Sequence, residues 1–234
     1  MFDPVLALHI PDGFLSNEVA ALAAIPAIAA VAYALRRAST TLDERRVPLL
    51  GVTAAFVFAV QMLNFPVAGG TSGHLLGAAL AAILLGPWLA CMVMTVVLTA
   101  QAFVFADGGI TALGANVLCM GVLGALLVGG LMLASRKALP KSSGVFLAIV
   151  AAGSWLAVML GALAASVLLA VSGTVPLDTV LPAMLAVHAL IGIGEAAITV
   201  TAVAAVLATR PDLIAVRDLQ PSELGVRPAT AQEA

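Results

Sequence analysis

Long apolar stretches follow one another along most of this chain, and short segments rich in Pro, Gly and charged residues separate them. A helix that spans a bilayer needs about 20 mainly apolar residues, and most of these stretches reach that length. The pattern therefore predicts an all-α membrane protein with seven helices. Their predicted ranges are residues 19–38, 47–64, 73–86, 88–106, 111–134, 143–171 and 180–209.

The third range, residues 73–86, is short for a full span. It follows a run rich in glycine at residues 69–73. Irregular backbone at membrane depth is tolerated only where protein buries it or where it lines a cavity. We therefore expect a short helix that is sheltered by its neighbours and entered from a Gly-rich loop.

The composition excludes an ordinary soluble domain. Hydrophobic residues make up 62% of the chain and charged residues 9%, whereas soluble domains are about 45–50% apolar and about 25% charged. Both cysteines, Cys91 and Cys119, fall inside predicted helices. A free thiol in a helix commonly packs as a small apolar group, so packing is favoured over a disulfide or a soft-metal site.

The ten Lys and Arg residues occur in three segments: between the first and second helices, between the fifth and sixth, and after the last. Lys and Arg are enriched in cytoplasmic loops, so the N-terminus is predicted to be outside and the C-terminus cytoplasmic. The outer segments contain acidic residues and no base. This acidity either concentrates cations at the surface or has no role, because Asp and Glu contribute little to topology.

Polar side chains inside predicted membrane helices are costly and mark candidate functional positions. For the amides, bonding to a main-chain carbonyl is favoured over contact with a ligand, whereas His74 is favoured as a ligand because it follows the Gly-rich run. Glu195 lies on the same helix face as His188, two turns further along. The polar residues predicted to share an outer pocket are Gln61, Asn64, His74, Gln101, Asn116 and His188.

Several motifs carry a family resemblance. They are His-Ile-Pro-Asp-Gly-Phe-Leu at 9–15, Asn-Phe-Pro-Val at 64–67, Gly-Gly-Thr-Ser-Gly-His at 69–74, Gln-Ala at 101–102, Asp-Gly-Gly at 107–109, Gly-Ala-Asn at 114–116 and the segment 188–195. Together they resemble the CbiM/NikM family, the cobalt and nickel substrate-binding (S) components of energy-coupling-factor transporters. The resemblance extends over nearly all of residues 8–208.

The resemblance implies a seven-helix S component of the bacterial cytoplasmic membrane, which is not an enzyme and has no nucleic-acid partner. It implies Co(II) or Ni(II) as the transported substrate, with no permanently bound cofactor, and leaves the choice between the two ions open. The implied partners are a transmembrane T subunit and a pair of cytoplasmic ATPases, with room for a small accessory membrane subunit. The chain has no G-x-x-x-x-G-K-[ST] sequence, which agrees with ATP hydrolysis on other subunits.

In the same family the metal is held by the N-terminal chain end and two histidines, which here correspond to His9 and His74. The chemistry is reasonable, because a chain that begins Xaa-His offers three nitrogen donors: its amine, the His main-chain nitrogen and the imidazole. Together they form fused chelate rings around one ion. A second imidazole completes a four-nitrogen plane, which suits Ni(II) or Cu(II) and, less selectively, Co(II). Asp12, which follows Pro11, is predicted to form a tight turn that folds this segment over the pocket.

This chain departs from the family pattern because seven residues precede Leu8. We expect the mature chain to begin at Leu8, either because the start is misassigned or because cleavage occurs after Ala7. The predicted regions are therefore an N-terminal extension at 1–7, a membrane metal-binding domain at 8–209 and a cytoplasmic tail at 210–234.

Two further questions stay open in the sequence. Ala20, Ala24 and Ala27 recur at helical spacing; the resemblance implies that such a face docks on the T subunit, whereas packing within the chain is the alternative. The function itself has two alternatives. One is an intramembrane metalloenzyme that uses the histidines and Glu195, although no H-E-x-x-H sequence occurs. The other is a stand-alone carrier, which would normally show inverted repeats.

Overall fold

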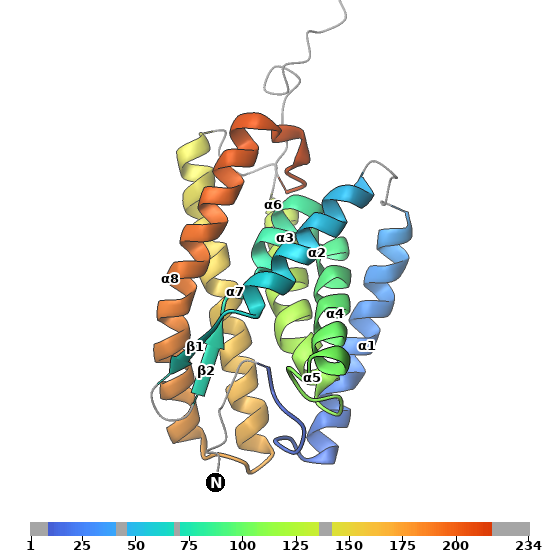
Figure 1. Ribbon diagram of the computed structural model, residues 1–234, viewed down its shortest axis with the longest axis vertical. Coiled ribbons are helices and arrows are strands. Elements are labelled where there is room, and N and C mark those ends of the chain that lie inside the picture. The colour runs from blue at the N-terminus through green and yellow to red at the C-terminus, as the bar shows by residue number, and fades with distance from the viewer. Residues whose placement is uncertain (1–8, 41–45, 68–70, 136–141, 217–234) are drawn as a thin grey trace, which may run out of the picture.

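The computed structural model describes residues 9–40, 46–67, 71–135 and 142–216. Figure 1 shows a bundle of long helices that run roughly along one axis. Its elements are α1 (Asn17–Ser39), α2 (Val47–Gln61), β1 (Asn64–Val67), β2 (Thr71–His74), α3 (Ala78–Leu85), α4 (Pro87–Val104), α5 (Leu113–Asn116), the π-helical η2 (Val117–Leu127), α6 (Val128–Ser135), α7 (Ser143–Val171), α8 (Leu177–Thr209) and a short 3-10 turn, η3 (Pro211–Leu213).

Five helices are long and apolar enough to cross a membrane, which confirms a multi-pass membrane protein. They are α1, α4, the continuous helix formed by α5, η2 and α6, α7 and α8. With α2 and the short α3, the described residues form seven helices in all. Most observed bounds agree with the predicted ranges to within about three residues, and α7 matches its predicted range at both ends.

The region around residues 62–77 differs from the prediction. α2 ends at Gln61, α3 begins at Ala78, and between them β1 and β2 form an antiparallel hairpin in which Asn64 pairs with His74. His74 therefore lies on a strand and not at the start of a helix. Pro and Gly within this segment disfavour a helix, and pairing within the hairpin satisfies main-chain groups that lipid could not.

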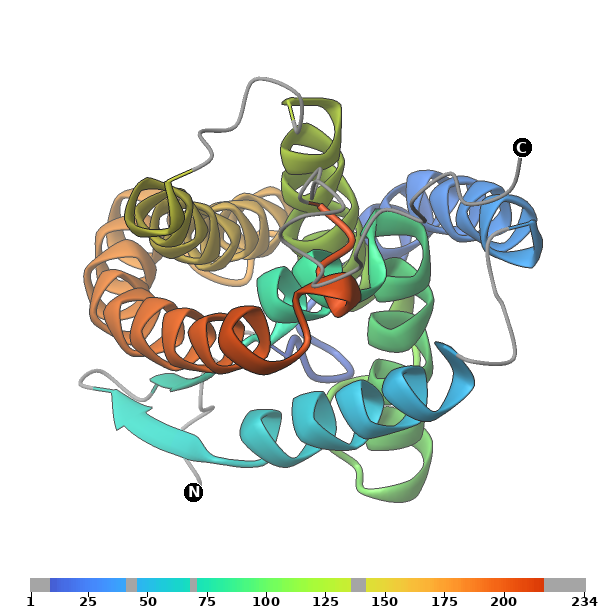
Figure 2. The ribbon, with the colours of Figure 1, turned by 90° about the horizontal axis from the view of Figure 1, so that it is seen from above.

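The short helix α3 lies inside the ring of longer helices, as Figure 2 shows. It contacts α2, α4, α7 and α8, and all of its residues except Leu84 are buried. η2 approaches it closely at Gly124, where a Cβ would lie 3.1 Å from side-chain atoms of Ala78 and Leu76. The predicted sheltered short helix is therefore present, although it begins later than the sequence indicated.

Both ends of α3 are bonded to distant parts of the chain. At its N-terminal end, the Glu195 carboxylate of α8 accepts hydrogen bonds from the main-chain N–H of Leu76 at 2.8 Å and of Gly77 at 2.7 Å. At its C-terminal end, the carbonyl of Ile83 accepts a hydrogen bond from the N–H of Ala215 at 2.8 Å. The segment after α8 thus closes back onto the bundle.

We expect replacement of Glu195 by alanine to destabilise the fold, because it leaves two buried N–H groups without an acceptor, at about 1–3 kcal/mol for each. The midpoint of thermal unfolding in detergent should fall clearly, and Glu195→Gln should be less severe because one amide oxygen remains. Thr201→Val is a suitable control, since that exposed hydroxyl bonds only to the carbonyl of Ala197 in its own helix. An unchanged midpoint for Glu195→Ala would contradict this assignment.

The two ends of the bundle differ in charge. Arg36 and Arg37 lie in the last turn of α1, Arg46 precedes α2, and Arg210 follows α8. In Figure 1 these helix ends lie together at the top, whereas the segment after residue 8 and the start of α8 lie at the bottom. The described Arg residues are therefore at the end of the bundle opposite the segment that begins at residue 9.

Candidate metal-binding site

The segment at residues 9–12 is hydrogen-bonded to the loop between α4 and α5 and to the end of α5, about 100 residues away in sequence. The side-chain amide of Asn116 pairs with the main chain of Ile10: its Oδ1 accepts from the N–H at 2.8 Å and its Nδ2 donates to the carbonyl at 3.1 Å. The same carbonyl of Ile10 accepts from the N–H of Gly109 at 2.9 Å. These bonds fix the backbone directly beside His9.

Asp12 holds the next part of this segment. Its carboxylate accepts hydrogen bonds from the N–H of Ile110 at 3.0 Å and of Thr111 at 2.7 Å, and from the Thr111 hydroxyl. The hydrogen bond from the Thr111 side chain is the main cause that lowers the pKa of Asp12, and the main-chain donors add to it. These hydrogen bonds use both carboxylate oxygens of Asp12 to anchor the segment.

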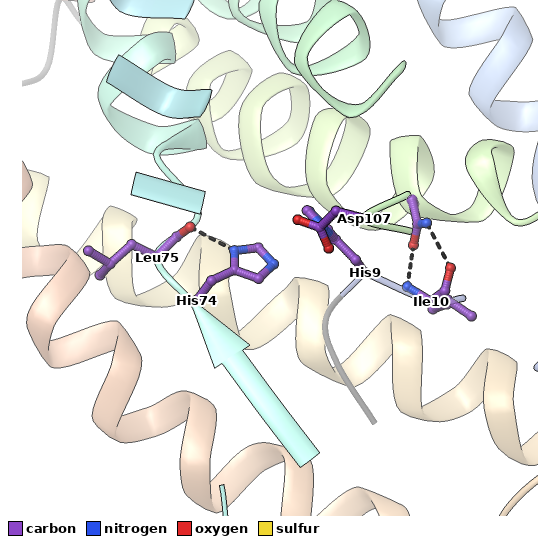
Figure 3. A network of polar contacts seen from close by, with 6 residues as sticks. His9, Ile10, His74, Leu75 and Asp107 are labelled. Carbon is purple, nitrogen blue, oxygen red and sulfur yellow. Dashed lines mark hydrogen bonds and ion pairs between the residues drawn. The ribbon is translucent and has the colours of Figure 1, made fainter. Parts of the chain in front are cut away.

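Two buried imidazoles meet where this segment passes β2. The rings of His9 and His74 have centroids 4.3 Å apart and are tilted by 52°, and each side chain is almost fully buried. Figure 3 shows the two rings approaching from different directions, His9 from the N-terminal segment and His74 from the end of β2. We call these two residues the histidine pair.

The His74 ring is held in one tautomer. Its Nδ1 lies 2.8 Å from the carbonyl oxygen of Leu75, and because a carbonyl only accepts, Nδ1 carries the proton and Nε2 has a lone pair. This Nε2 has no hydrogen-bond partner among the described residues. Burial and the neighbouring His9 lower the pKa of His74 to about 3, so the ring is neutral near pH 7. It is thus a nitrogen donor without a partner.

Asp107 contacts the other imidazole. Its Oδ1 lies 3.1 Å from Nδ1 of His9, and Figure 3 shows the carboxylate against the ring. Burial opposes ionisation of Asp107, but its contacts with His9 outweigh burial and lower the pKa of the carboxyl. The sequence did not single out Asp107 as a site residue; its signal was the Asp-Gly-Gly motif in an outer loop. Gly108 follows it with a φ of +92°, a backbone conformation that residues with a side chain rarely adopt.

The remaining polar candidates are buried as well: Gln61, Gln101, His188 and Glu195. Gln61 donates through Nε2 to the carbonyl of Leu76 at 2.8 Å, which is the kind of bond that the sequence favoured for the amides. Gln101 is fully buried, and neither of its amide atoms has a partner among the described residues. His188 of α8 is also buried, and its Nδ1 lies 2.8 Å from the carbonyl of Met184. Both carboxylate oxygens of Glu195 accept main-chain hydrogen bonds at the N-terminal end of α3.

The described residues contain only part of the metal site that the sequence predicts. Across the described residues, no three His, Cys, Asp or Glu side chains are placed so that they could hold one ion. Leu8, the predicted source of an amine donor, and the side chain of Asn64 lie outside the part of the chain that the structure describes. Both cysteines are buried and free. The pair thus offers two imidazoles as candidate ligands.

The alanine face of α1 is turned largely inward. Ala27 is buried, and a Cβ at Gly114 of α5 would lie 2.6 Å from the Cβ of Ala24. Ala20 is half-buried. The outward surface of α1 instead presents large apolar side chains, namely Leu22, Ile25 and Ile28. These contacts match the alternative of packing within the chain, and docking of the alanines on a partner stays a prediction.

Comparison with known proteins identifies the family. The profile of CbiM, described as the cobalt uptake substrate-specific transmembrane region, matches residues 9–213. The chain belongs to this family. The match extends from the first residue of the histidine pair to the turn that follows α8, and so includes the whole bundle.

Relatives of this CbiM-family chain are named as transport proteins and not as enzymes. A putative metal transport protein of Haloquadratum walsbyi is 43% identical over 88% of this chain and 93% of its own length. A putative fused nickel transport protein, NikMN, of Archaeoglobus fulgidus is 41% identical over 88% of this chain and 68% of its own length. The crystal structure of a transition metal transporter superposes with a TM-score of 0.75 and 32% identity, over 85% of this chain and 92% of that one.

Proposed function

We propose that this chain is the substrate-binding (S) component of an ATP-driven importer of the bacterial cytoplasmic membrane, which captures Co(II) or Ni(II) at its outer face. The observation that carries the proposal is the histidine pair: two buried imidazoles in contact, each with an Nε2 that has no hydrogen-bond partner among the described residues, at the end of the bundle opposite the described Arg residues. Burying such a nitrogen without a partner costs about 1–3 kcal/mol, and a bound ion would remove that cost.

The donor chemistry supports a first-row transition ion. Imidazole nitrogen suits Ni(II), Co(II) and Cu(II), whereas Mg(II) and Ca(II) prefer oxygen. The hydrogen bond from Nδ1 of His74 to Leu75 orients the ring, in the way that a supporting acceptor does for most metal-bound histidines. The amine of Leu8 and the main-chain nitrogen of His9 would complete a four-nitrogen plane. Asp107 would orient His9 before the ion arrives.

The charge asymmetry supports the orientation. With the basic end cytoplasmic, the histidine pair faces outward, and the acidic residues of that end favour the approach of cations. Energy would come from a separate T subunit and a pair of ATPases, since the sequence has no nucleotide-binding loop of the G-x-x-x-x-G-K-[ST] type. A small accessory membrane subunit would be a further partner.

The proposal is tested by metal analysis and uptake with the same protein. Protein purified from its native host with an unmodified N-terminus should bind one Ni(II) or Co(II) ion, and uptake of either ion by the host should fall when its gene is deleted. Uptake by the chain expressed alone in a host without related transporters should be absent. Uptake by the isolated chain would instead favour a stand-alone carrier, and failure to bind either ion would remove the proposal.

A further inference from the structure

A groove of about 400 Å³ lies between α1, α4 and the helix that begins with α5. Its volume is within the range of about 300–1,000 Å³ that is usual for ligand pockets. Figure 1 shows α1 at the edge of the bundle, beside α4. The α1 wall of the groove extends from Ala24 to Ala32, and Thr95 and Thr99 form the α4 wall. The groove contains neither histidine of the pair.

The lining of the groove is suited to hydrocarbon. Apart from the two threonines and a glycine, every lining residue is Ala, Val, Ile or Leu. The threonine hydroxyls donate within their own helix: Thr95 to the carbonyl of Cys91 at 2.8 Å, and Thr99 to the carbonyl of Thr95 at 2.7 Å. A polar ligand would therefore gain little here, whereas an alkyl chain would meet apolar side chains along its length.

The groove is too narrow to admit another helix. At one end α1 meets α5, because a Cβ at Gly114 would lie 2.6 Å from the Cβ of Ala24. α1 also contacts α4, and helices in contact have axes about 8–10 Å apart. A helix with its side chains is about 10–12 Å across, so it can lie over such a groove but cannot enter it. An acyl chain, which is one methylene wide, can enter.

Aromatic and basic side chains continue the two walls toward the basic end of the bundle. Trp88 lies two turns before Thr95 on the same face of α4, and Tyr33 directly follows Ala32. Their ring centroids are 5.2 Å apart, so this pair joins α1 to α4. The guanidinium carbon of Arg37 lies 5.7 Å from the centroid of the Trp88 ring. Trp, Tyr and Arg in such positions are typical of the membrane surface.

The spacing along α1 corresponds to one leaflet of a bilayer. Val31 and Ile28 lie about 9 Å and about 14 Å from Arg37 along the helix axis, at 1.5 Å per residue. Half of the hydrocarbon core is about 15 Å thick. A lipid with its phosphate at Arg37 therefore has its acyl chain at the depth of the groove. The planar fork of a guanidinium matches a phosphate group, and α4 begins at Pro87, so its N-terminal end also favours an anion at this level.

We propose that this groove binds an anionic glycerophospholipid, with one acyl chain along residues 24–32 and the phosphate at Arg37 and Trp88. In the orientation given above, the lipid belongs to the cytoplasmic leaflet, which carries anionic lipids. α1 is the least buried of the five long spans, and the hydrophobic effect does not hold helices together in a membrane. The lipid supplies contacts that join α1 to α4. No metal takes part, so the inference is independent of the proposed function.

The first measurement is lipid binding to the full chain in detergent after lipid has been removed. Native mass spectrometry should show one bound dioleoyl phosphatidylglycerol, with an affinity about fivefold above that for dioleoyl phosphatidylcholine, the gain expected from one Arg at the membrane surface. Arg37→Gln should abolish this difference and Arg37→Lys should retain most of it. Arg210→Gln is the control, because Arg210 lies at the same end and pairs with Asp212. Equal affinity of wild-type protein for both lipids would overturn the proposal.

The second measurement fills the groove. Thr95→Leu, and separately Ala32→Leu at an exposed lining position, should weaken binding of both lipids by about tenfold or more, because fewer methylenes are buried. Thr201→Leu is the control, since this exposed hydroxyl in α8 also bonds within its own helix. Thermal unfolding without lipid identifies any variant that has lost its fold. Wild-type affinity in either folded filling variant would place the lipid elsewhere.

The third measurement asks what occupies the groove in the assembled protein. Phosphatidylglycerol with a photoreactive group in the middle of one acyl chain is added to protein purified from its native host, with any subunits that accompany it. The label should be found in residues 24–32 and 95–99. Labelling of these residues in the isolated chain but not in the assembled protein would show that a partner helix covers the groove, and labelling spread evenly over all helices would show no site. Either result would refute the lipid assignment.

Discussion

Affinity for Ni(II) or Co(II) is expected to fall by more than about 100-fold when His74 is replaced by alanine, which exceeds the loss caused by removing a group that only supports a ligand. The structure gives the reason. Nε2 of His74 is an uncharged metal donor with no hydrogen-bond partner among the residues that the structure describes, and the bond from Nδ1 to the Leu75 carbonyl holds the ring in place. Isothermal titration of the purified protein in detergent measures the affinity.

Cys119→Ala is the matched control for His74→Ala. Cys119 is as buried as His74, but it packs among the apolar side chains of the core. Its replacement should leave the affinity unchanged. Thermal unfolding of both variants, measured without metal, separates loss of a ligand from loss of the fold. Equal weakening by both substitutions, with unfolding unchanged, would show that the metal is bound elsewhere.

The helices could be predicted because their signal is local. A long apolar run that ends at Pro, Gly or charge contains most of the information that defines a membrane helix. The run at 143–171 ends at Ser142 on one side and at Gly173 on the other, and α7 has these bounds. The distribution of Arg and Lys likewise predicted that the described Arg residues lie at one end of the bundle, because a charged side chain inside it is costly.

The hairpin could not be predicted in the same way. Its two strands are four residues each, and the pairing of Asn64 with His74 is a property of the main chain that apolar periodicity does not encode. Pro66 and the glycines indicated an irregular segment, but a loop and a short hairpin have the same composition. The helical start that we assigned to residue 73 was wrong for this reason.

The site was predictable in its histidines but not in its supporting contacts. His9 and His74 were selected by the chemistry of nitrogen donors and by family resemblance, and the structure brings their rings together. The contact of Asp107 with His9, and the clamp of Asn116 on Ile10, join segments about 100 residues apart. Such contacts depend on how α4 and α5 pack, which no local motif specifies. The motifs marked these residues without indicating their partners.

The position of the N-terminus should change the affinity for Ni(II) or Co(II) as much as the loss of the His74 imidazole does. We predict that protein beginning at Leu8 binds Ni(II) or Co(II) more tightly than protein beginning at Met1. Only the shorter chain places an α-amine next to the main-chain nitrogen and imidazole of His9. Linking donors in one short segment raises their effective concentration, and the expected gain is about 10²–10⁴-fold. Intact-mass measurement of the protein from its native host should correspondingly give a chain that starts at position 8, as Met or Leu.

A chain that begins at Leu6 is the matched control for this comparison. It differs from the Leu8 chain by two residues, keeps His9, His74 and Asp107, and places the amine too far from the imidazole for fused chelate rings. Its affinity should equal that of the full chain, and acetylation of the Leu8 amine should lower the affinity to the same level. If all of these forms bind equally, the amine is not a ligand. The ion would then be held by the histidine pair with side-chain donors alone, of which Asp107 is the nearest to His9.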